Sequence, residues 1–328
     1  MSVIERNFSV NASRYDQYSA IQYYCGEQLL EYLSLAPSCR ILDLGCATGK
    51  TTYQLSKRCP EARITAIDFA PGMIAWAKNH HAHPSIHYHC EDIFTFNPEF
   101  QFDSLFSNVT FQWLNRSEVR GPRSEDQENV HMFLPSMGEG DNRPDVRGRN
   151  VGEGPYACPS SHIRGGNIIR AEDTDTARRV CTRADNPFLF RRLSSWLKPF
   201  GIAGLSIFGP QTFCELAFVL KKHLRISSFL SSETFLPLPS WTKVTETYFK
   251  EDLVKEERIT VLYPTLLDFL KTIHATGAQG NGVSPKRLWT HRLIAHLDKE
   301  YRQIYGGISV TYQIFYIILR KRQIPVPK

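Results

Sequence analysis

Apolar runs and amphipathic stretches alternate along the first third of the chain. Residues 17–35 carry apolar positions at helical spacing, and Pro37 follows them. The next stretches predict strands at RILDLGC, RITAIDF, SIHYHCED and FDSLFSNVTF, and helices at GKTTYQLSKRCP and PGMIAWAKNHH. Strands separated by helices of this length predict βαβ units and a parallel sheet.

Regular patterns return in the last part of the chain. FLFRRLSSWLKPFG predicts an amphipathic helix that ends at Lys198-Pro199 and Gly201, and IAGLSIFG predicts the strand after it. The pattern then predicts helices at ELAFVLKKHLRISSFL and TLLDFLKTIHATGAQGNG. TETYFKEDLVKEERITVLY predicts two strands joined by a polar turn, and GGISVTYQIFYIILRKR predicts a long final strand.

Residues 119–186 interrupt this order. They are rich in Gly, Pro, Arg, Asp and Ser and show neither helical nor strand periodicity. A structureless segment of this length does not fit inside a packed domain, so we expect an irregular, disordered insertion. A functional lid and a stretch that is not native coding sequence are the alternatives.

Composition narrows the class of protein. The hydrophobic share of 42% and the charged share of 22% are typical of a soluble globular chain. No apolar stretch is long enough to span a bilayer, and MSVIERNFSVNAS has no secretory core. The eight cysteines are scattered, so we expect reduced thiols and a cytoplasmic protein without membrane association. The net charge of +6 favours an acidic partner, but no basic stripe interleaved with aromatics predicts nucleic-acid binding.

The stretch LDLGCATGK, residues 42–50, places an acid and two glycines where a predicted strand ends and a helix begins. Glycine lets the backbone approach a ligand closely and helps the helix to pack on the sheet. Dinucleotides fit such a loop best with GxGxxG spacing, and the GxxxxGK spacing of a P-loop is absent. S-adenosylmethionine carries no phosphate and favours an acid near its cationic methionine end, a charge that Asp43 supplies.

Acidic residues also end the next two predicted strands. Asp68 can hold both hydroxyls of a ribose, although it could also be a helix cap before Pro71. Asp92 can accept the amino group of an adenine, and Ile93 can cover the ring. Acids at three consecutive strand ends, beside the glycines, favour a nucleoside cofactor over three unrelated surface acids.

These motifs resemble a known family. LDLGCATGK, AIDFAPGMIAWAK, CEDIFTF and FDSLFSNVTFQW resemble the successive motifs of class I S-adenosylmethionine-dependent methyltransferases. FSVNASRYDQYSAIQ, LKPFGIAGLSIFGPQTFCEL and GGISVTYQIFY narrow the resemblance to the malonyl-[acyl-carrier protein] O-methyltransferases, which open the biotin pathway. The resemblance covers residues 7–117 and 187–322. Ala47 departs from it, because the family usually has glycine there; if that position needs a positive φ, alanine costs about 1 kcal/mol.

The resemblance implies a fold and a domain organisation. The fold is α/β, a Rossmann-like doubly wound sheet that is mostly parallel with an antiparallel C-terminal strand, interrupted by the long insertion. One methyltransferase domain would then consist of residues 1–118, with an N-terminal helix and the cofactor-binding half, and residues 187–322, with the remainder and the helices near the substrate. Residues 119–186 would be the insertion between them.

The resemblance also implies the ligands and the site. The cofactor is S-adenosyl-L-methionine, and the substrate is the free carboxylate of a malonyl thioester on an acidic acyl-carrier protein. The cofactor-binding residues that it implies are Asp43, Gly45, Ala47, Gly49, Asp68, Phe69, Met73, Asp92, Ile93, Asn108 and Gln22. The residues that it places around the transferred methyl are Asn108, Gln112, Trp113 and Tyr15, with Tyr15 and Gln22 in an N-terminal element that closes over the cofactor.

Several alternatives stay open. Lys221, Lys222 and Arg225 are candidates for contact with the carrier protein, although a solvated helix face explains each of them better when it is taken singly. The run HHAHPSIHYHC lacks the closed Cys/His spacing of a metal site, so we expect no metal. The acceptor could instead be another small carboxylic acid or a quinone, or the chain could be a methyltransferase-fold binding protein without turnover. We expect a monomer.

Overall fold

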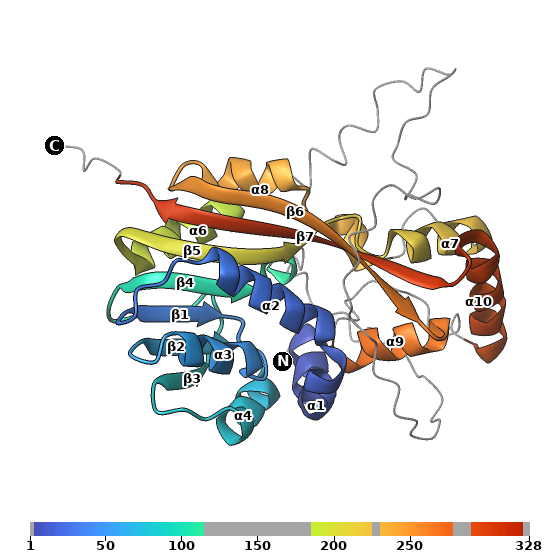
Figure 1. Ribbon diagram of the computed structural model, residues 1–328, viewed down its shortest axis with the longest axis horizontal. Helices are drawn as coiled ribbons and strands as arrows, with labels where there is room; N and C mark the ends of the chain where they lie inside the picture. Colours follow the sequence, from blue (N-terminus) through green and yellow to red (C-terminus); the bar gives the residue numbers. More distant parts are fainter. Residues whose placement is uncertain (1–2, 115–184, 225–229, 278–289, 324–328) are drawn as a thin grey trace, which may run out of the picture.

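A seven-stranded sheet with the order β3-β2-β1-β4-β5-β7-β6 forms the centre of the computed structural model (Figure 1), which describes residues 3–114, 185–224, 230–277 and 290–323. Strands β1 to β5 pair in parallel, and β7 is antiparallel to its neighbours β5 and β6. The strands are β1 (Arg40–Leu44), β2 (Arg63–Asp68), β3 (Ile86–Cys90), β4 (Phe102–Asn108), β5 (Leu197–Phe208), β6 (Phe249–Tyr263) and β7 (Ile308–Lys321). The predicted parallel half and the antiparallel C-terminal strand are both confirmed.

Helices cover both faces of the sheet. Side chains along a strand alternate between faces, so Ile41 joins one apolar cluster with α2 and α3, while Leu42 joins another with α6 and α8. The helices are α1 (Val3–Tyr18), α2 (Ala20–Tyr32), α3 (Lys50–Arg58), α4 (Pro71–His80), α6 (Asp185–Trp196), α7 (Cys214–Leu224), α8 (Leu238–Thr245), α9 (Leu266–Ala275) and α10 (His291–Tyr305), with short 3-10 turns η1 (Phe111–Trp113) and η2 (Ser231–Thr234). None of these helices is long and apolar enough to cross a membrane.

The prediction of two strands joined by a turn at residues 245–263 is wrong. The segment forms the single strand β6, which pairs with β7 along its whole length and shifts register between Glu251 and Leu253. Asp252 sits at this irregularity and forms an ion pair with Arg320 at 2.6 Å. The polar residues that predicted a turn are exposed because β6 is an edge strand.

The helix before β5 also ends earlier than predicted. It ends at Trp196, and β5 already begins at Leu197, which pairs with Phe102 before a register shift. Phe200 has a φ of 64° in this irregular stretch, so Pro199 is accommodated within a bulged strand instead of a helix end.

Two further expectations concern the insertion and the cysteines. The predicted disordered segment 119–186 lies outside the described residues, except that α6 begins at Asp185.

Of the cysteines in the described residues, five are free thiols, but Cys214 is disulfide-bonded, which contradicts the expectation of reduced thiols throughout. Spacing along the chain cannot reveal which cysteines meet in space. The free cysteines are Cys25, Cys39, Cys46, Cys59 and Cys90.

The sheet order brings the predicted site residues to one edge. Strands β2, β1 and β4 are neighbours, so their carboxyl ends, at Asp68, Leu44 and Asn108, lie side by side. The first helix, α1, packs against α4 and α9 (Figure 1). It therefore lies beside the edge of a parallel sheet where ligands usually bind.

Candidate active site

The loop after β1 has three residues with positive φ. Gly45 and Gly49 have φ values of 76° and 77°, and Ala47 has a φ of 47°. A Cβ on Gly45 would lie 2.2 Å from Thr110 Oγ1, and a Cβ on Gly49 would lie 2.5 Å from the Tyr88 hydroxyl. The two glycines are therefore required by backbone conformation and by internal packing. Ala47 has the positive φ at which alanine was expected to be strained, so its conformation costs about 1 kcal/mol.

Two buried carboxylates lie beneath this loop. Asp43 Oδ2 accepts a hydrogen bond from the Thr52 hydroxyl at 2.6 Å, and burial raises the pKa of Asp43 to about 7, with a further contribution from the charge of Asp68. Asp68 accepts the N–H groups of Ala47 and Ala70 at 3.0 and 2.9 Å. Burial nevertheless raises the pKa of Asp68 to about 6. Among the described residues, no positive side chain lowers the pKa of either carboxylate.

The end of β4 is tied to β5 and to α2. Asn108 Oδ1 accepts the hydroxyl of Ser206 at 2.6 Å, and Asn108 Nδ2 donates to the backbone carbonyl of Gln22 at 2.8 Å. Gln22 Oε1 is buried and has no hydrogen-bond partner. Because a buried, unpaired oxygen is costly, it marks a position where a ligand donor fits.

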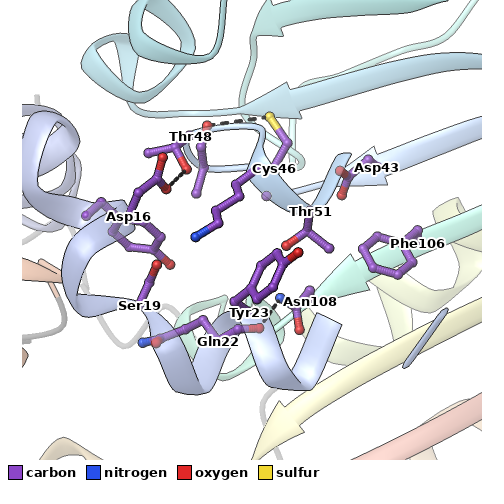
Figure 2. Close-up of a pocket in the computed structure, with 14 residues that line it drawn as sticks. Asp16, Ser19, Gln22, Tyr23, Asp43, Cys46, Thr48, Thr51, Phe106 and Asn108 are labelled. Atoms are coloured by element: carbon purple, nitrogen blue, oxygen red, sulfur yellow. Dashed lines mark hydrogen bonds between the residues drawn. The ribbon is translucent and has the colours of Figure 1, made fainter. Parts of the chain in front are cut away.

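These groups surround one pocket, shown in Figure 2. Side chains from α1 and α2 face the glycine loop and the end of β4 across it. The predicted site residues that line the pocket are Tyr15, Gln22, Asp43, Gly45, Ala47 and Asn108. Burial, and next the charge of Asp68, raises the pKa of Tyr15 well above its usual range, so Tyr15 is a neutral phenol.

The other predicted site residues lie around this pocket without lining it. Gly49 caps α3, Asp68 bonds the loop as described, and Asp92 Oδ1 accepts the N–H of Phe94 at 2.9 Å. Met73 is buried in a cluster with Ala12 and Ala70, and Ile93 is buried in the cluster that contains Leu42. Their roles toward a cofactor stay predictions.

A series of aromatic side chains in contact with one another joins α1, beside the pocket, to η1. The ring of Phe8 on α1 lies 6.2 Å from both Phe69 and Trp113, and Trp113 lies 5.8 Å from Phe235. Gln112 Nε2 donates to the carbonyl of Val109 at 2.8 Å, while Gln112 Oε1 is buried and unpaired. Gln112 and Trp113 are thus next to the end of β4, and their predicted contact with the transferred methyl stays a prediction.

Several pocket residues were not predicted. They are Asp16, Ser19, Tyr23, Cys46, Thr48, Lys50, Thr51 and Phe106. Thr48 lies within the glycine loop, and Lys50 and Thr51 directly follow its last glycine, so the loop and the start of the helix were the signals that could have found them. Asp16 gave no such signal, because its hydrogen bond from the Thr48 hydroxyl, at 2.6 Å, joins two distant parts of the chain.

Helix α1 fits closely over this site. A Cβ on Gly72, at the start of α4, would lie 2.3 Å from the carbonyl oxygen of Ser9. Phe8 and Tyr15 pack against the buried cluster that contains Met73. The predicted N-terminal element that covers the pocket is therefore α1 together with the start of α2.

Two lysines of the basic stretch lie beside acidic residues, and two histidines of the histidine-rich stretch line a second pocket. Lys221 forms an ion pair with Glu233, and Lys222 Nζ lies 4.0 Å from Glu300; Arg225 lies outside the described residues. His87 and His89 line a separate surface pocket beside Lys78. In the part of the chain that the structure describes, no group of three or more His, Cys, Asp or Glu residues could hold a metal ion.

The pocket fits the cofactor that the sequence implied. The buried carboxylates of Asp43, which lines the pocket, and Asp68, which lies beside it, need positive charge, and Gln22 Oε1 needs a donor. Asp68 uses two of its lone-pair positions on backbone N–H groups, which leaves two for hydroxyl donors. A nucleoside that carries a sulfonium and an ammonium group supplies all of these.

Comparisons with known proteins agree with this assignment. Residues 41–122 match a family model described as a methyltransferase domain. A malonyl-[acyl-carrier protein] O-methyltransferase from Bacillus anthracis is 45% identical over 118 residues, which cover 35% of this chain and 44% of that protein. A second protein of that name, from Ilyobacter polytropus, is 26% identical over 324 residues, which cover 97% of both.

Solved structures are more remote. The N-methyltransferase NodS from Bradyrhizobium japonicum, solved with S-adenosyl-L-homocysteine, has 12% identity and a TM-score of 0.39, with coverage of 91% of this chain and 86% of that one. The strand order, the glycine loop with its buried carboxylates and the matched methyltransferase model carry the conclusion. Residues 41–122 thus form a methyltransferase domain within a sheet of the class I methyltransferase type, and S-adenosylmethionine is its cofactor.

Proposed function

We propose that this protein methylates the free carboxylate of a malonyl thioester held by an acyl-carrier protein, an early step of biotin synthesis. The observation that carries the proposal is the similarity along the whole chain to relatives that bear this activity in their names. For the Ilyobacter polytropus protein, the alignment covers 97% of this chain and 97% of the relative. The stronger match to the Bacillus anthracis protein covers less than half of that relative, so it supports the cofactor half of the proposal most directly.

The residues of the pocket have distinct parts in holding the cofactor. Asp43 and Gln22 would meet the cationic methionine end, and Asp68 would accept the ribose hydroxyls. Lys50, whose Nζ lies over the Tyr23 ring at 4.5 Å, would meet the methionine carboxylate. Phe69, Met73, Asp92 and Ile93 would surround the adenine.

Methylation of a carboxylate makes few chemical demands on the protein. When bound, the cofactor would supply a methyl group on a positively charged sulfur, whose S–C bond would break as the O–C bond forms, with a neutral thioether as the leaving group. The acceptor is already ionised at neutral pH, and no proton has to move. The protein must align the two reactants and exclude water. The neutral phenol of Tyr15 and the cover formed by α1 suit that task.

The turn after β4 would position the acceptor. Val109 has a φ of 52°, an unusual conformation for a β-branched residue, and its N–H donates to the backbone carbonyl and hydroxyl oxygens of Ser206 at 2.9 and 3.0 Å. The same hydroxyl donates to Asn108. Ser206 thus fixes the turn that carries Asn108, Gln112 and Trp113, the residues we propose to surround the transferred methyl.

Mass spectrometry of the carrier-bound product tests this proposal. The protein is incubated with methyl-labelled S-adenosylmethionine and, separately, malonyl-carrier protein, malonyl-CoA, free diacids and a quinone precursor. We expect a labelled methyl ester on malonyl-carrier protein at the highest kcat/KM. Preferential labelling of a free acid or of a quinone carbon would overturn the acceptor, and binding of the cofactor without single-turnover transfer would indicate a protein that only binds.

A further inference from the structure

Helix α10 presents an exposed basic stripe to solvent. Arg292, His296 and Lys299 follow one another at helical spacing and are all exposed. The opposite side of the helix is buried through Ile294, Leu297 and Tyr301. The stripe therefore points directly away from the core, and packing does not explain its composition.

The acidic residues beside this stripe are already paired within the protein. Asp298 accepts a hydrogen bond from Arg302 Nε at 2.7 Å, and Glu300 lies 3.2 Å from His223 Nε2 and 4.0 Å from Lys222 Nζ. Among the described residues, Arg292 and Lys299 form no ion pair. An ordinary solvated helix face mixes both signs of charge, whereas this one leaves its unpaired charges all positive.

Helix α7 extends the same surface. The ring of His223 lies 5.1 Å from the ring of His296 in an edge-to-face arrangement, so the end of α7 packs against the middle of the stripe. Figure 1 shows α7, α9 and α10 grouped at the same end of the molecule. Lys222 adds a side chain that is 51% exposed. We call Arg292, His296, Lys299 and Lys222 the α10 basic face.

The α10 basic face lies on the acceptor side of the sheet. Helix α7 follows the carboxyl end of β5, where Ser206 pairs with Asn108. Helix α9 packs against α10 and also against α1, which covers the cofactor pocket. A partner bound to this face could therefore pass a long flexible arm along α9 toward the turn after β4.

We propose that the α10 basic face is the docking surface for the acidic carrier protein. This inference rests on the proposed function, since it assumes a substrate that arrives on such a carrier. It also revises the candidates taken from the sequence: Lys221 is neutralised by Glu233, and the unpaired charges lie on α10 instead. Complementary charge of this kind raises the rate of encounter and makes it sensitive to salt.

A double charge reversal, Arg292→Glu with Lys299→Glu, tests the docking surface. We expect the KM for malonyl-carrier protein to rise roughly tenfold or more, with kcat nearly unchanged, because docking charges act on association. The kcat/KM for malonyl-pantetheine, which lacks the carrier, and the Kd for S-adenosylmethionine should stay at wild-type values. Added salt should raise the KM for the carrier substrate in wild type more steeply than in the variant.

Two controls make the result specific. Arg63→Glu with Lys78→Glu changes the net charge equally on β2 and α4, away from α10, and should leave the KM unchanged. Arg292→Lys with Lys299→Arg keeps the charge and should behave as wild type. An unchanged carrier KM in the double reversal, in an enzyme that does methylate malonyl-carrier protein, would overturn the docking surface alone. Wild-type enzyme that fails to methylate that carrier substrate would instead overturn the proposed function.

Discussion

Asp43 is a residue whose energetics depend on whether the pocket is filled. It is 2% exposed, and its only hydrogen-bond donor in the described structure is the Thr52 hydroxyl. Its pKa of about 7, raised by burial, means that the empty folded protein holds a proton that the unfolded chain releases near pH 4. The stability contributed by this group is therefore complete below the unfolded pKa and is lost as the pH rises through about 7.

We predict that Asp43→Asn removes this pH dependence. Relative to wild type, the free energy of unfolding of the variant without cofactor should rise by about 2–3 kcal/mol between pH 5 and pH 8. The same variant should lose S-adenosylmethionine binding, because the amide carries no charge. Denaturant unfolding at several pH values measures the first effect, and calorimetry measures the second.

Asp103 offers a control of opposite sign. Burial disfavours its charged form, but the N–H of Arg40 at 2.8 Å and the ammonium of Lys198 at 2.7 Å hold its pKa below the usual value. Asp103→Asn should therefore cost stability at neutral pH, and this cost should fade as the pH falls through the folded pKa. A parallel response of the two variants to pH would show that burial of Asp43 does not act as described.

Ala47 provides a second prediction at this scale. Its φ of 47° is strained for alanine, so Ala47→Gly should stabilise the protein by roughly 0.5–1 kcal/mol despite the greater freedom of glycine in the unfolded chain. Ala77→Gly is the matched control, because Ala77 is fully buried within α4, and it should destabilise by about 1 kcal/mol or more. Thermal unfolding of the two variants should move in opposite directions, and a loss of stability in Ala47→Gly would contradict the strain.

At the scale of elements, the fit of α1 over α4 controls access to the pocket. The Cβ of an alanine at position 72 would collide with backbone atoms of Ser9, which cannot rotate away as a side chain could. Alanine is otherwise a better helix former than glycine, so α4 itself should tolerate it. We predict that Gly72→Ala displaces α1 and raises the Kd for S-adenosylmethionine at least about fivefold.

Hydrogen exchange can locate this effect. The amides of α1 should lose protection in Gly72→Ala, while those of β1, β2 and β4 keep it. Gly307→Ala is the control, because a Cβ at Gly307 meets no atom within 4 Å and the residue has no positive φ. Wild-type cofactor affinity in Gly72→Ala would mean that α1 does not have to lie against α4 for the pocket to bind.

The elements also differ in how well the sequence predicts them. Strands β1, β2 and β4 are short and apolar, β3 alternates, and helices separate β1 from β2 and β2 from β3, so local pattern alone predicts them. Local pattern fails for β6, because an edge strand exposes residues such as Lys250, Glu251 and Asp252 that elsewhere form turns. The family resemblance implies the antiparallel direction of β7. Its position between β5 and β6 could not be predicted, since periodicity within a strand does not encode its neighbours.

The same distinction applies to the site. The positions that follow strand ends, such as Asp43 and Asn108, could be predicted because the carboxyl ends of parallel strands share one edge. Asp16 could not, because it reaches the pocket only through the packing of α1 on the glycine loop. Ser206 could not either, because its bonds to Asn108 and Val109 exist only once β4 and β5 pair.

At the scale of the whole molecule, cofactor binding and global stability are linked through the buried carboxylates. Asp43 and Asp68 have pKa values of about 7 and 6 in the protein without cofactor, because burial favours their neutral forms. A bound cation favours the charged forms, so binding should release protons when it occurs near or below these pKa values. The affinity for S-adenosylmethionine should therefore increase as the pH rises from about 5.5 to 8.

The thermal stability of the complete protein reports this linkage. As the pH rises, the empty protein loses the stability of its protonated carboxylates, while the filled pocket supplies the positive charge that they lack. A fixed excess of S-adenosylmethionine should consequently raise Tm by more at pH 8 than at pH 5.5, since tighter binding adds more stability. Asp43→Asn should show little shift at either pH, and Asp103→Asn should keep the wild-type trend. An equal shift at both pH values in wild type would mean that the carboxylates do not ionise on binding, and that the positive charge of the cofactor is met elsewhere.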